Sequence, residues 1–182
     1  ILTTAMKRQL IDKETSDAVT LNMETLNKYP FDVLKQNKIT VTACTDVTGF
    51  GLLGHAKEML QHKKSDNEET ISLELYAQSV PLLPQVMELA IANVIPGGSL
   101  NNVKFVEPFV EYEKSITKLQ KSILSDAQTS GGLLFAVPES EVAKVQEAFS
   151  KAENVPCCVP IGKFVASGAK DAKILIKDAK FQ

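Results

Sequence analysis

Apolar side chains recur along the chain with two different periods, and these periods predict alternating helices and strands. Apolar residues three and four positions apart, as in Val19, Met23 and Leu26, are typical of a helix with one buried face. β-Branched runs and strict alternation are typical of strands. The helices predicted in this way cover residues 1–11, 15–27, 52–62, 78–95, 115–124 and 138–152, with a shorter turn or helix at 31–36. Thr15 or Ser16 is the expected cap of the second helix.

The predicted strands indicate how the helices are organised. They cover residues 39–45, 71–76, 133–137, 157–166 and 172–177. The last two are separated by turn residues and are predicted to form a closing hairpin. Residues 63–70 are expected as a polar connector, and residues 96–102 and 125–132 as loops. Because not every pair of neighbouring strands is separated by a helix, we expect an α/β fold in which a mixed β-sheet has helices packed against it.

The composition of the chain argues against a nucleic-acid-binding or membrane-spanning protein. The chain has 182 residues, of which 44% are hydrophobic and 23% charged, with a formal net charge of −2. This length is sufficient for one domain with its own core. The basic stripe of a nucleic-acid-binding protein is missing, and the most apolar window, residues 80–95, is too short and too polar to span a bilayer. We therefore expect a single domain over residues 1–182, with no nucleic-acid or membrane partner.

The cysteines and the first residue suggest the context of the chain. An odd number of cysteines without a Cys-x-x-Cys motif (Cys44, Cys157 and Cys158) is typical of reduced thiols in the cytoplasm. The adjacent pair is predicted to lie in a strand, with the two side chains on opposite faces. The chain begins with Ile1 instead of Met, and no signal-peptide pattern follows, so we expect a fragment of a longer protein.

The sequence TDVTGFGLLGH at residues 45–55 is the strongest indication of chemistry. It places Asp46 at the mouth of a glycine-rich turn between a predicted strand and a predicted helix. Glycines let the backbone come close to a ligand, and a helix N-terminus favours anions. A carboxylate there would repel a bare phosphate, so the pattern suggests a cation between the two. Asp46 is thus either a metal ligand or the N-cap of the following helix.

The same turn also matches a dinucleotide-binding pattern. Gly49, Gly51 and Gly54 have the spacing Gly-x-Gly-x-x-Gly, and Glu74 follows at about the offset of a ribose-binding acid. Against this, Asp46 would place a negative charge where the pyrophosphate binds. A dinucleotide-binding oxidoreductase domain remains an alternative at this stage. His55, one turn into the helix, is more typical of a packing or capping residue than of a catalyst.

Four segments together resemble the selenophosphate synthetases, also called selenide, water dikinases. They are ILTTAMK at 1–7, ACTDVTGFGLLGH at 43–55, PGGS at 96–99 and DAQTSGGLL at 126–134. The resemblance covers essentially all 182 residues. Three positions depart from the family: Ala127 replaces a common proline, Asn101 replaces an arginine of some members, and Ser99 replaces a threonine but keeps the hydroxyl.

The resemblance implies an ATP-dependent enzyme that uses magnesium. Such an enzyme makes selenophosphate from selenide, ATP and water, and releases AMP and orthophosphate. For this chain it implies the C-terminal domain fold of the aminoimidazole ribonucleotide synthetase superfamily. The family's N-terminal ATP-binding domain, with its reactive cysteine or selenocysteine and the main interface of the homodimer, is expected to be absent from this chain. We therefore expect no catalytic residue here, and a fragment of a cytoplasmic enzyme that is inactive by itself.

The resemblance also implies roles for individual residues. Asp46 is expected to be one ligand of a magnesium–ATP site whose other ligands lie outside this chain. Thr45, Gly49 and Gly51 are expected to form the turn next to the phosphates. Cys44 does not correspond to the reactive cysteine of the family. A non-catalytic binding module with the same fold is the alternative interpretation.

Overall fold

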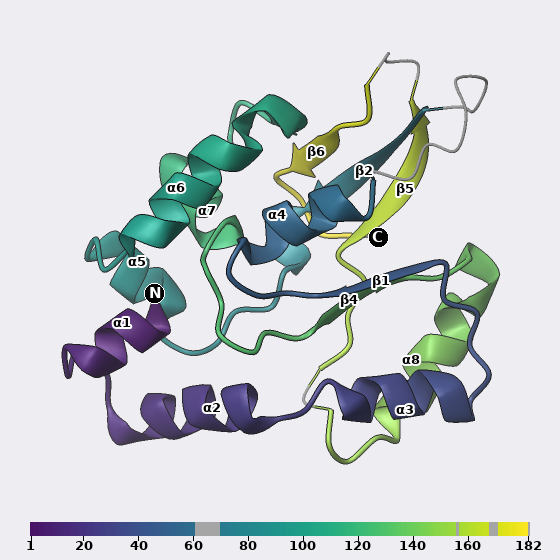
Figure 1. Ribbon diagram of the computed structural model, residues 1–182, viewed down its shortest axis with the longest axis horizontal. Helices are drawn as coiled ribbons and strands as arrows, with labels where there is room; N and C mark the ends of the chain where they lie inside the picture. The colour runs from purple at the N-terminus through teal and green to yellow at the C-terminus, as the bar shows by residue number, and fades with distance from the viewer. Residues whose placement is uncertain (61–69, 156, 168–170, 182) are drawn as a thin grey trace.

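The computed structural model describes residues 1–60, 70–155, 157–167 and 171–181 (Figure 1). The strands are β1 (Ala43–Asp46), β2 (Thr70–Tyr76), β3 (Val110–Tyr112), β4 (Leu133–Ala136), β5 (Gly162–Ser167) and β6 (Ile174–Lys177). The α-helices are α1 (Leu2–Lys7), α2 (Lys13–Glu24), α3 (Lys28–Gln36), α4 (Gly51–Glu58), α5 (Val86–Ile91), α6 (Gly97–Val106), α7 (Lys118–Leu124) and α8 (Val142–Ser150). Three short 3-10 turns are η1 (Ala77–Ser79), η2 (Glu107–Phe109) and η3 (Glu139–Glu141).

The strands form two sheets. The larger sheet has four strands in the order β3–β6–β2–β5, and the smaller consists of β1 and β4 in antiparallel pairing. In the larger sheet β6 runs parallel to both β2 and β3, whereas β5 is antiparallel to β2. The predicted α/β fold, a mixed sheet with helices packed against it, is confirmed.

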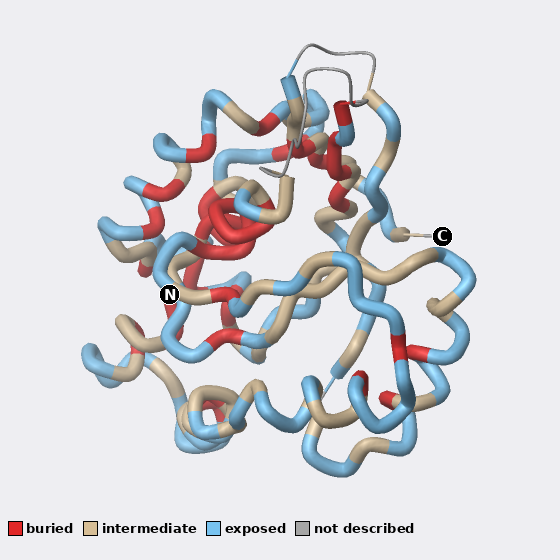
Figure 2. The backbone as a smooth tube through the Cα atoms, turned by 45° about the vertical axis from the view of Figure 1, so that its right-hand side comes forward, coloured by how far each residue is buried: buried red, intermediate tan, exposed pale blue. Residues whose placement is uncertain are grey.

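The alternation of side chains in the larger sheet decides which face is buried. Leu75 of β2 and Ile174 and Ile176 of β6 lie on the buried face and are at most 1% exposed. Ile71 lies on the same face of β2 but is 51% exposed, because it precedes the part of β2 that pairs with β6. The helices α4, α6 and α7 contribute buried residues to the same core. Figure 2 shows that buried residues are concentrated in and around α4, where all residues from Gly51 to Ala56 are buried. The glycine turn that precedes α4 therefore begins directly at the main core.

Two smaller apolar clusters hold the remaining helices. One joins α1, α2, α5 and α7 through residues such as Ala5, Val19 and Leu89. The other joins α3 and α8 through Leu34 and Phe149. Figure 1 shows α3 and α8 side by side at the end of the molecule away from α5 and α6. The central sheet and the pair α3–α8 are thus separate packing units.

The predicted closing hairpin is wrong. β5 and β6 are not paired with each other, because β2 lies between them. β5 begins only at Gly162, so Cys157 and Cys158 precede the strand, and their prediction as strand residues is also wrong. Cys157 is exposed and Cys158 is half-buried, and this burial raises the pKa of Cys158 to about 11. Of the predicted turn, residues 168–170 lie outside the described residues.

The helix predicted over residues 78–95 is confirmed only over Val86–Ile91, and the loop predicted over 96–102 is wrong. Prolines at 81 and 84 and the left-handed conformation of Gln85, with φ 63°, delay the start of α5 to Val86. Gly97 and Gly98, expected in a turn because glycine disfavours helices, form the first turn of α6. Burial of Ser99 and Val106 on the inner side of α6 compensates for that low propensity.

Several element boundaries differ from the prediction. Asp12 caps α2, because its Oδ1 accepts a hydrogen bond of 2.7 Å from Thr15 N, so the helix begins before Thr15 and Ser16. The strand predicted from residue 39 begins at Ala43, because Ile39 is buried in the cluster of α3 and α8. The first helix ends at Lys7. Most of the predicted connector, residues 63–69, lies outside the described residues, and no helix in the described part is long and apolar enough to cross a bilayer.

Truncation of Ile174 tests the central position of β6. Ile174 is fully buried between β2 and β3, so Ile174→Ala is expected to lower the free energy of unfolding by about 2–5 kcal/mol. Ile71→Ala, in the same sheet but half exposed, is the matched control and is expected to cost less than about 1 kcal/mol. Urea denaturation of the two variants measures the difference. Equal losses would contradict the central, buried position assigned to Ile174.

Candidate functional site

Three loops from distant parts of the chain meet at the end of the small sheet. They are the glycine turn after β1 at residues 47–50, the start of α6 at 96–102, and the loop between α7 and β4 at 125–132. Backbone hydrogen bonds of 3.0 Å join the first loop to the third, from Val47 N to the Gly132 carbonyl and from Gln128 N to the Thr48 carbonyl. Three of the four segments that carry the family resemblance are therefore neighbours in space.

Asn102 connects all three loops. Its side-chain amide lies on α6, is 8% exposed, and donates to the Gly49 carbonyl at 2.8 Å and the Ser125 carbonyl at 3.1 Å. A buried amide that donates twice fixes the separation of two loops, because either carbonyl would lose its partner if its loop moved. Nothing in the sequence distinguished Asn102 from Asn101, which is exposed.

Ser99 and Asp126 form a second connection. Ser99 Oγ donates to Asp126 Oδ1 at 2.5 Å and accepts from Ala127 N at 3.1 Å, and Ser99 is fully buried. The hydroxyl that Ser99 shares with the family's threonine thus has a structural role. The carboxylate of Asp126 already accepts this hydrogen bond from Ser99, so Asp126 is a poor candidate for a metal ligand.

Asp46 has a different environment from Asp126. It is the last residue of β1 and is exposed, and among the described residues its carboxylate has no hydrogen-bond or ion-pair partner. The helix that follows has Phe50 at its N-cap position and no side-chain cap. The alternative that Asp46 caps this helix is therefore wrong. A free carboxylate at the end of a strand can bind a cation without first breaking a protein contact.

The predicted phosphate-proximal residues do not all lie on one surface. Thr45 is half-buried and points to the opposite face of β1 from Asp46, because side chains alternate along a strand. Gly51 is buried, with φ +70°, and a Cβ there would lie 2.7 Å from the carbonyl carbon and oxygen of Ser125. Gly49 is exposed and has open space where a Cβ would be. Of the three, only Gly49 leaves its backbone accessible to a ligand.

His55 and Cys44 have environments that do not suggest catalysis. His55 is buried, with Nε2 3.0 Å from Thr48 Oγ1 and Nδ1 3.1 Å from Glu58 Oε2. These contacts fit the packing role expected for it. Cys44 lies on the same exposed face of β1 as Asp46. Desolvation and, to a smaller extent, the charge of Asp46 raise the pKa of Cys44, so its thiol is less readily ionised than a free cysteine.

The topology rules out the dinucleotide interpretation. A dinucleotide fold needs β1 and the next strand to be parallel neighbours in one sheet, joined by the intervening helix. Here β1 pairs with β4 in the small sheet, while β2 belongs to the central sheet. Glu74 accepts a hydrogen bond of 3.1 Å from the Tyr76 hydroxyl and lies 3.8 Å from Lys163 Nζ. It is therefore not a free ribose-binding acid.

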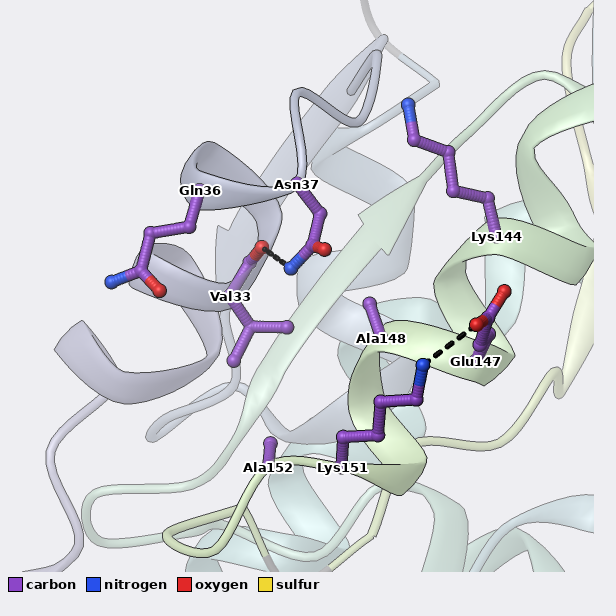
Figure 3. A pocket seen from close by; sticks show the side chains of 8 residues that line it. All are labelled: Val33, Gln36, Asn37, Lys144, Glu147, Ala148, Lys151 and Ala152. Atoms are coloured by element: carbon purple, nitrogen blue, oxygen red, sulfur yellow. Dashed lines mark hydrogen bonds and ion pairs between the residues drawn. The ribbon is translucent and has the colours of Figure 1, made fainter.

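A cavity of about 310 Å³ lies elsewhere, between α3 and α8 (Figure 3). Four of its five polar side chains, those of Asn37, Lys144, Glu147 and Lys151, have hydrogen-bond partners within the protein. Lys151 binds Glu147 at 2.7 Å and lowers the pKa of that carboxyl, and Asn37 donates to the Val33 carbonyl. None of its lining residues belongs to the three loops, so we do not assign the candidate site to this cavity.

Asp46 alone does not make a metal centre. In the parts of the chain that the structure describes, no group of three or more His, Cys, Asp or Glu side chains is placed to hold a metal ion. A carboxylate oxygen is nevertheless the type of donor that Mg²⁺ prefers, and Mg²⁺ is commonly bound by one or two carboxylates together with phosphate oxygens and water. The chemistry of Asp46 fits one ligand of such a site.

Comparison with known proteins matches the chain to one family and to a group of curated enzymes. Residues 1–174 match the family described as AIR synthase related protein, C-terminal domain. The selenide, water dikinase of Carboxydothermus hydrogenoformans is 39% identical over 151 residues, or 81% of this chain and 41% of the relative. That of Aliarcobacter butzleri is 38% identical over 141 residues, or 78% of this chain and 38% of the relative. For the enzyme of Clostridium botulinum (strain Eklund 17B / Type B), the identity is 35% over 178 residues, or 97% of this chain and 48% of the relative.

These matches confirm the resemblance found in the sequence. The chain spans less than half the length of these curated relatives. The matched part of each relative is therefore about the size of one domain.

Replacement of the Asn102 amide by a carboxylate tests the connection between the loops. In Asn102→Asp a negative charge would face the carbonyls of Gly49 and Ser125 in a buried position. We expect a loss of at least about 3 kcal/mol in the free energy of unfolding at neutral pH. Burial raises the pKa of the new acid in the folded state, so the loss is expected to shrink as the pH falls towards about 4, where the acid is protonated.

The exposed neighbour Asn101 provides the control for this measurement. Asn101→Asp adds the same charge one residue away at the surface of α6. It is expected to change the free energy of unfolding by less than about 0.5 kcal/mol. Similar losses for the two variants, or a loss for Asn102→Asp that does not depend on pH, would contradict the role assigned to Asn102.

Two alanine substitutions separate the structural glycine from the accessible one. Gly51→Ala would combine a positive φ with a close contact to Ser125, and is expected to cost at least about 2 kcal/mol. Gly49→Ala meets open space at an ordinary φ and is expected to change stability by less than about 1 kcal/mol. Thermal and urea unfolding measure both. A well-tolerated Gly51→Ala would show that this turn is not held as described.

Proposed function

Because the chain belongs to the family of AIR synthase related C-terminal domains, we propose that it is the C-terminal domain of a selenide, water dikinase. The similarity to curated dikinases over 78–97% of the chain in these three matches supports the proposal. The full-length protein would convert selenide, ATP and water to selenophosphate, AMP and orthophosphate. The remaining domain, which would bind most of the ATP and carry the reactive cysteine or selenocysteine, lies outside these 182 residues.

The observation that carries the mechanistic part of this proposal is the free carboxylate of Asp46. The acidic residue within the three loops, Asp126, is bound by Ser99, whereas Asp46, directly before the first loop, is exposed and without a partner among the described residues. Asp46 is unpaired, and hydrogen bonds from Val47 to Gly132 and from Asn102 to Gly49 hold the turn that follows it. Such a carboxylate is suited to hold a cation beside a phosphate. We assign Asp46 as the metal ligand that this domain contributes to a shared magnesium–ATP site.

The surrounding residues would position Asp46 and leave room for the nucleotide. Asn102 and the Val47–Gly132 hydrogen bond hold the two ends of the turn. Gly49 presents a backbone without a side chain, so a phosphate oxygen could approach it closely. Bound magnesium would supply charge neutralisation for the triphosphate. Phosphoryl transfer depends mainly on such positioning and neutralisation, and the protein need not form a covalent bond.

The chain on its own does not provide all the ligands that a magnesium–ATP site needs. One carboxylate is too few to hold Mg²⁺ and a triphosphate, so the other ligands would come from the remaining domain. We therefore propose that the 182-residue chain alone neither hydrolyses ATP nor makes selenophosphate. The full-length enzyme would be a homodimer assembled through the remaining domain. A cytoplasmic location, supported by three free cysteines, completes the proposal.

Substitution of Asp46 in the full-length protein tests the assignment. Asp46→Asn keeps the shape of the side chain but removes its charge. We expect selenide-dependent formation of AMP to fall at least about 100-fold, and the Mg²⁺ concentration for half-maximal activity to rise. Because the carboxylate has no partner here, the free energy of unfolding should change by less than about 0.5 kcal/mol.

A distant exposed carboxylate serves as the matched control. Glu111 lies in β3 of the central sheet, and Glu111→Gln removes one surface charge without touching the three loops. Its activity and its magnesium dependence are expected to equal those of the unmodified protein. Near-normal activity of Asp46→Asn would overturn the assignment of Asp46, whatever the control shows.

A further inference from the structure

Three phenylalanines form a cluster on the surface of α4 and α6, which we call the aromatic cluster: Phe50, Phe105 and Phe109. The ring centroids of Phe50 and Phe105 are 5.6 Å apart, and those of Phe105 and Phe109 are 6.5 Å apart. Phe50 is 51% exposed and Phe105 is 46% exposed. Contiguous aromatic side chains that remain half in solvent are typical of a surface that another polypeptide covers.

The aromatic cluster is held in place by its neighbours. A Cβ on Gly54 would lie 2.6 Å from Phe50 Cβ, so the absence of a side chain at Gly54 allows Phe50 to lie against α4. The Phe50 ring also meets the buried His55 ring edge-on, with centroids 5.9 Å apart. On the other side, Lys57 Nζ lies 4.1 Å from the Phe109 centroid and 5.1 Å from that of Phe105. An ordered aromatic surface loses little conformational freedom when it binds.

The aromatic cluster adjoins the turn that carries Asp46. Phe50 directly follows Gly49, whose carbonyl accepts a hydrogen bond from Asn102 of α6. Phe105 lies on α6 too, three residues after Asn102. The connection that fixes the Asp46 turn therefore also fixes the position of Phe50 relative to Phe105. Other strongly exposed apolar residues, such as Leu21 and Ile91, lie on α2 and α5.

The position of the aromatic cluster indicates its partner. Asp46 needs further ligands, the described residues do not provide them, and the curated relatives have more than half of their length outside the matched region. Resting on the function proposed above, we propose that the aromatic cluster is the docking surface for the part of the longer protein that brings the remaining ligands to Asp46. The aromatic contacts would thereby set the distance between Asp46 and those ligands.

Photo-cross-linking in the full-length protein identifies the partner directly. Phe105 is replaced by p-benzoyl-phenylalanine, which keeps an aromatic ring at this position, and linked peptides are identified by mass spectrometry after irradiation. We expect links to peptides outside residues 1–182. The same replacement at Phe164 on β5, a phenylalanine 37% exposed and outside the aromatic cluster, is the matched control and is expected to give few such links.

The outcomes separate the docking surface from the catalytic proposal. Links from position 105 only to residues 1–182 of a second copy, no links, or links no more frequent than from position 164 would overturn the docking surface. Asp46→Asn should leave the links from position 105 unchanged, because it removes a ligand and not the aromatic contact. An Asp46→Asn protein with near-normal activity but unchanged links would overturn the assignment of Asp46 while supporting the docking surface.

A second variant tests whether docking supports the metal site. Phe50→Ser together with Phe105→Ser in the full-length protein is expected to raise the Mg²⁺ concentration for half-maximal activity several-fold. Phe164→Ser is the control and should leave this concentration unchanged. An unaltered magnesium dependence of the double variant would overturn the inference that the aromatic cluster positions the remaining ligands.

Discussion

The arrangement of the candidate site depends on one buried amide. Asn102 is the side chain through which α6 binds both the glycine turn and the end of α7, and its two hydrogen bonds go to carbonyls of segments far apart in the sequence. Because the amide is buried, the loss of either bond would leave a polar group without solvent compensation. The turn that carries Asp46 is therefore fixed to the main core, although Asp46 itself stands at the surface.

The polar residues of the three loops have two distinct tasks. Ser99, Asp126, Thr48 and His55 bind other parts of the protein, and these pairs account for their presence without any ligand. Asp46 differs because it has no such partner among the described residues. A site that must bind a cation needs a carboxylate whose lone pairs are free, and a rigid surrounding that keeps the carboxylate in place. The pairs in these loops provide the rigid surrounding.

The sequence could predict the strand–turn–helix around Asp46, because its signals are local: an apolar strand, glycines and a helical repeat follow one another within about fifteen residues. It could not predict α6, whose glycine-rich first turn depends on Ser99 and Asn102 partners that are 27 and 53 residues away. Pairing of β2 with both β5 and β6 likewise depends on distant residues, so the local turn signal wrongly indicated a hairpin. The role of Asp46 came from the family resemblance, since the local sequence alone favoured a helix cap over a metal ligand.

The strand order also constrains how the protein can assemble during synthesis. β2 is finished at Tyr76, but both of its neighbours lie between Gly162 and Lys177, and β3 pairs with the last of these strands. The ribosome must therefore release about a hundred further residues before the central sheet can close, which gives this domain a high contact order. The small sheet of β1 and β4 is complete by Ala136. The Asp46 turn can thus form before β6 covers the apolar faces of β2, α4 and α6. At this stage the nascent domain exposes the most apolar surface and is most prone to aggregate.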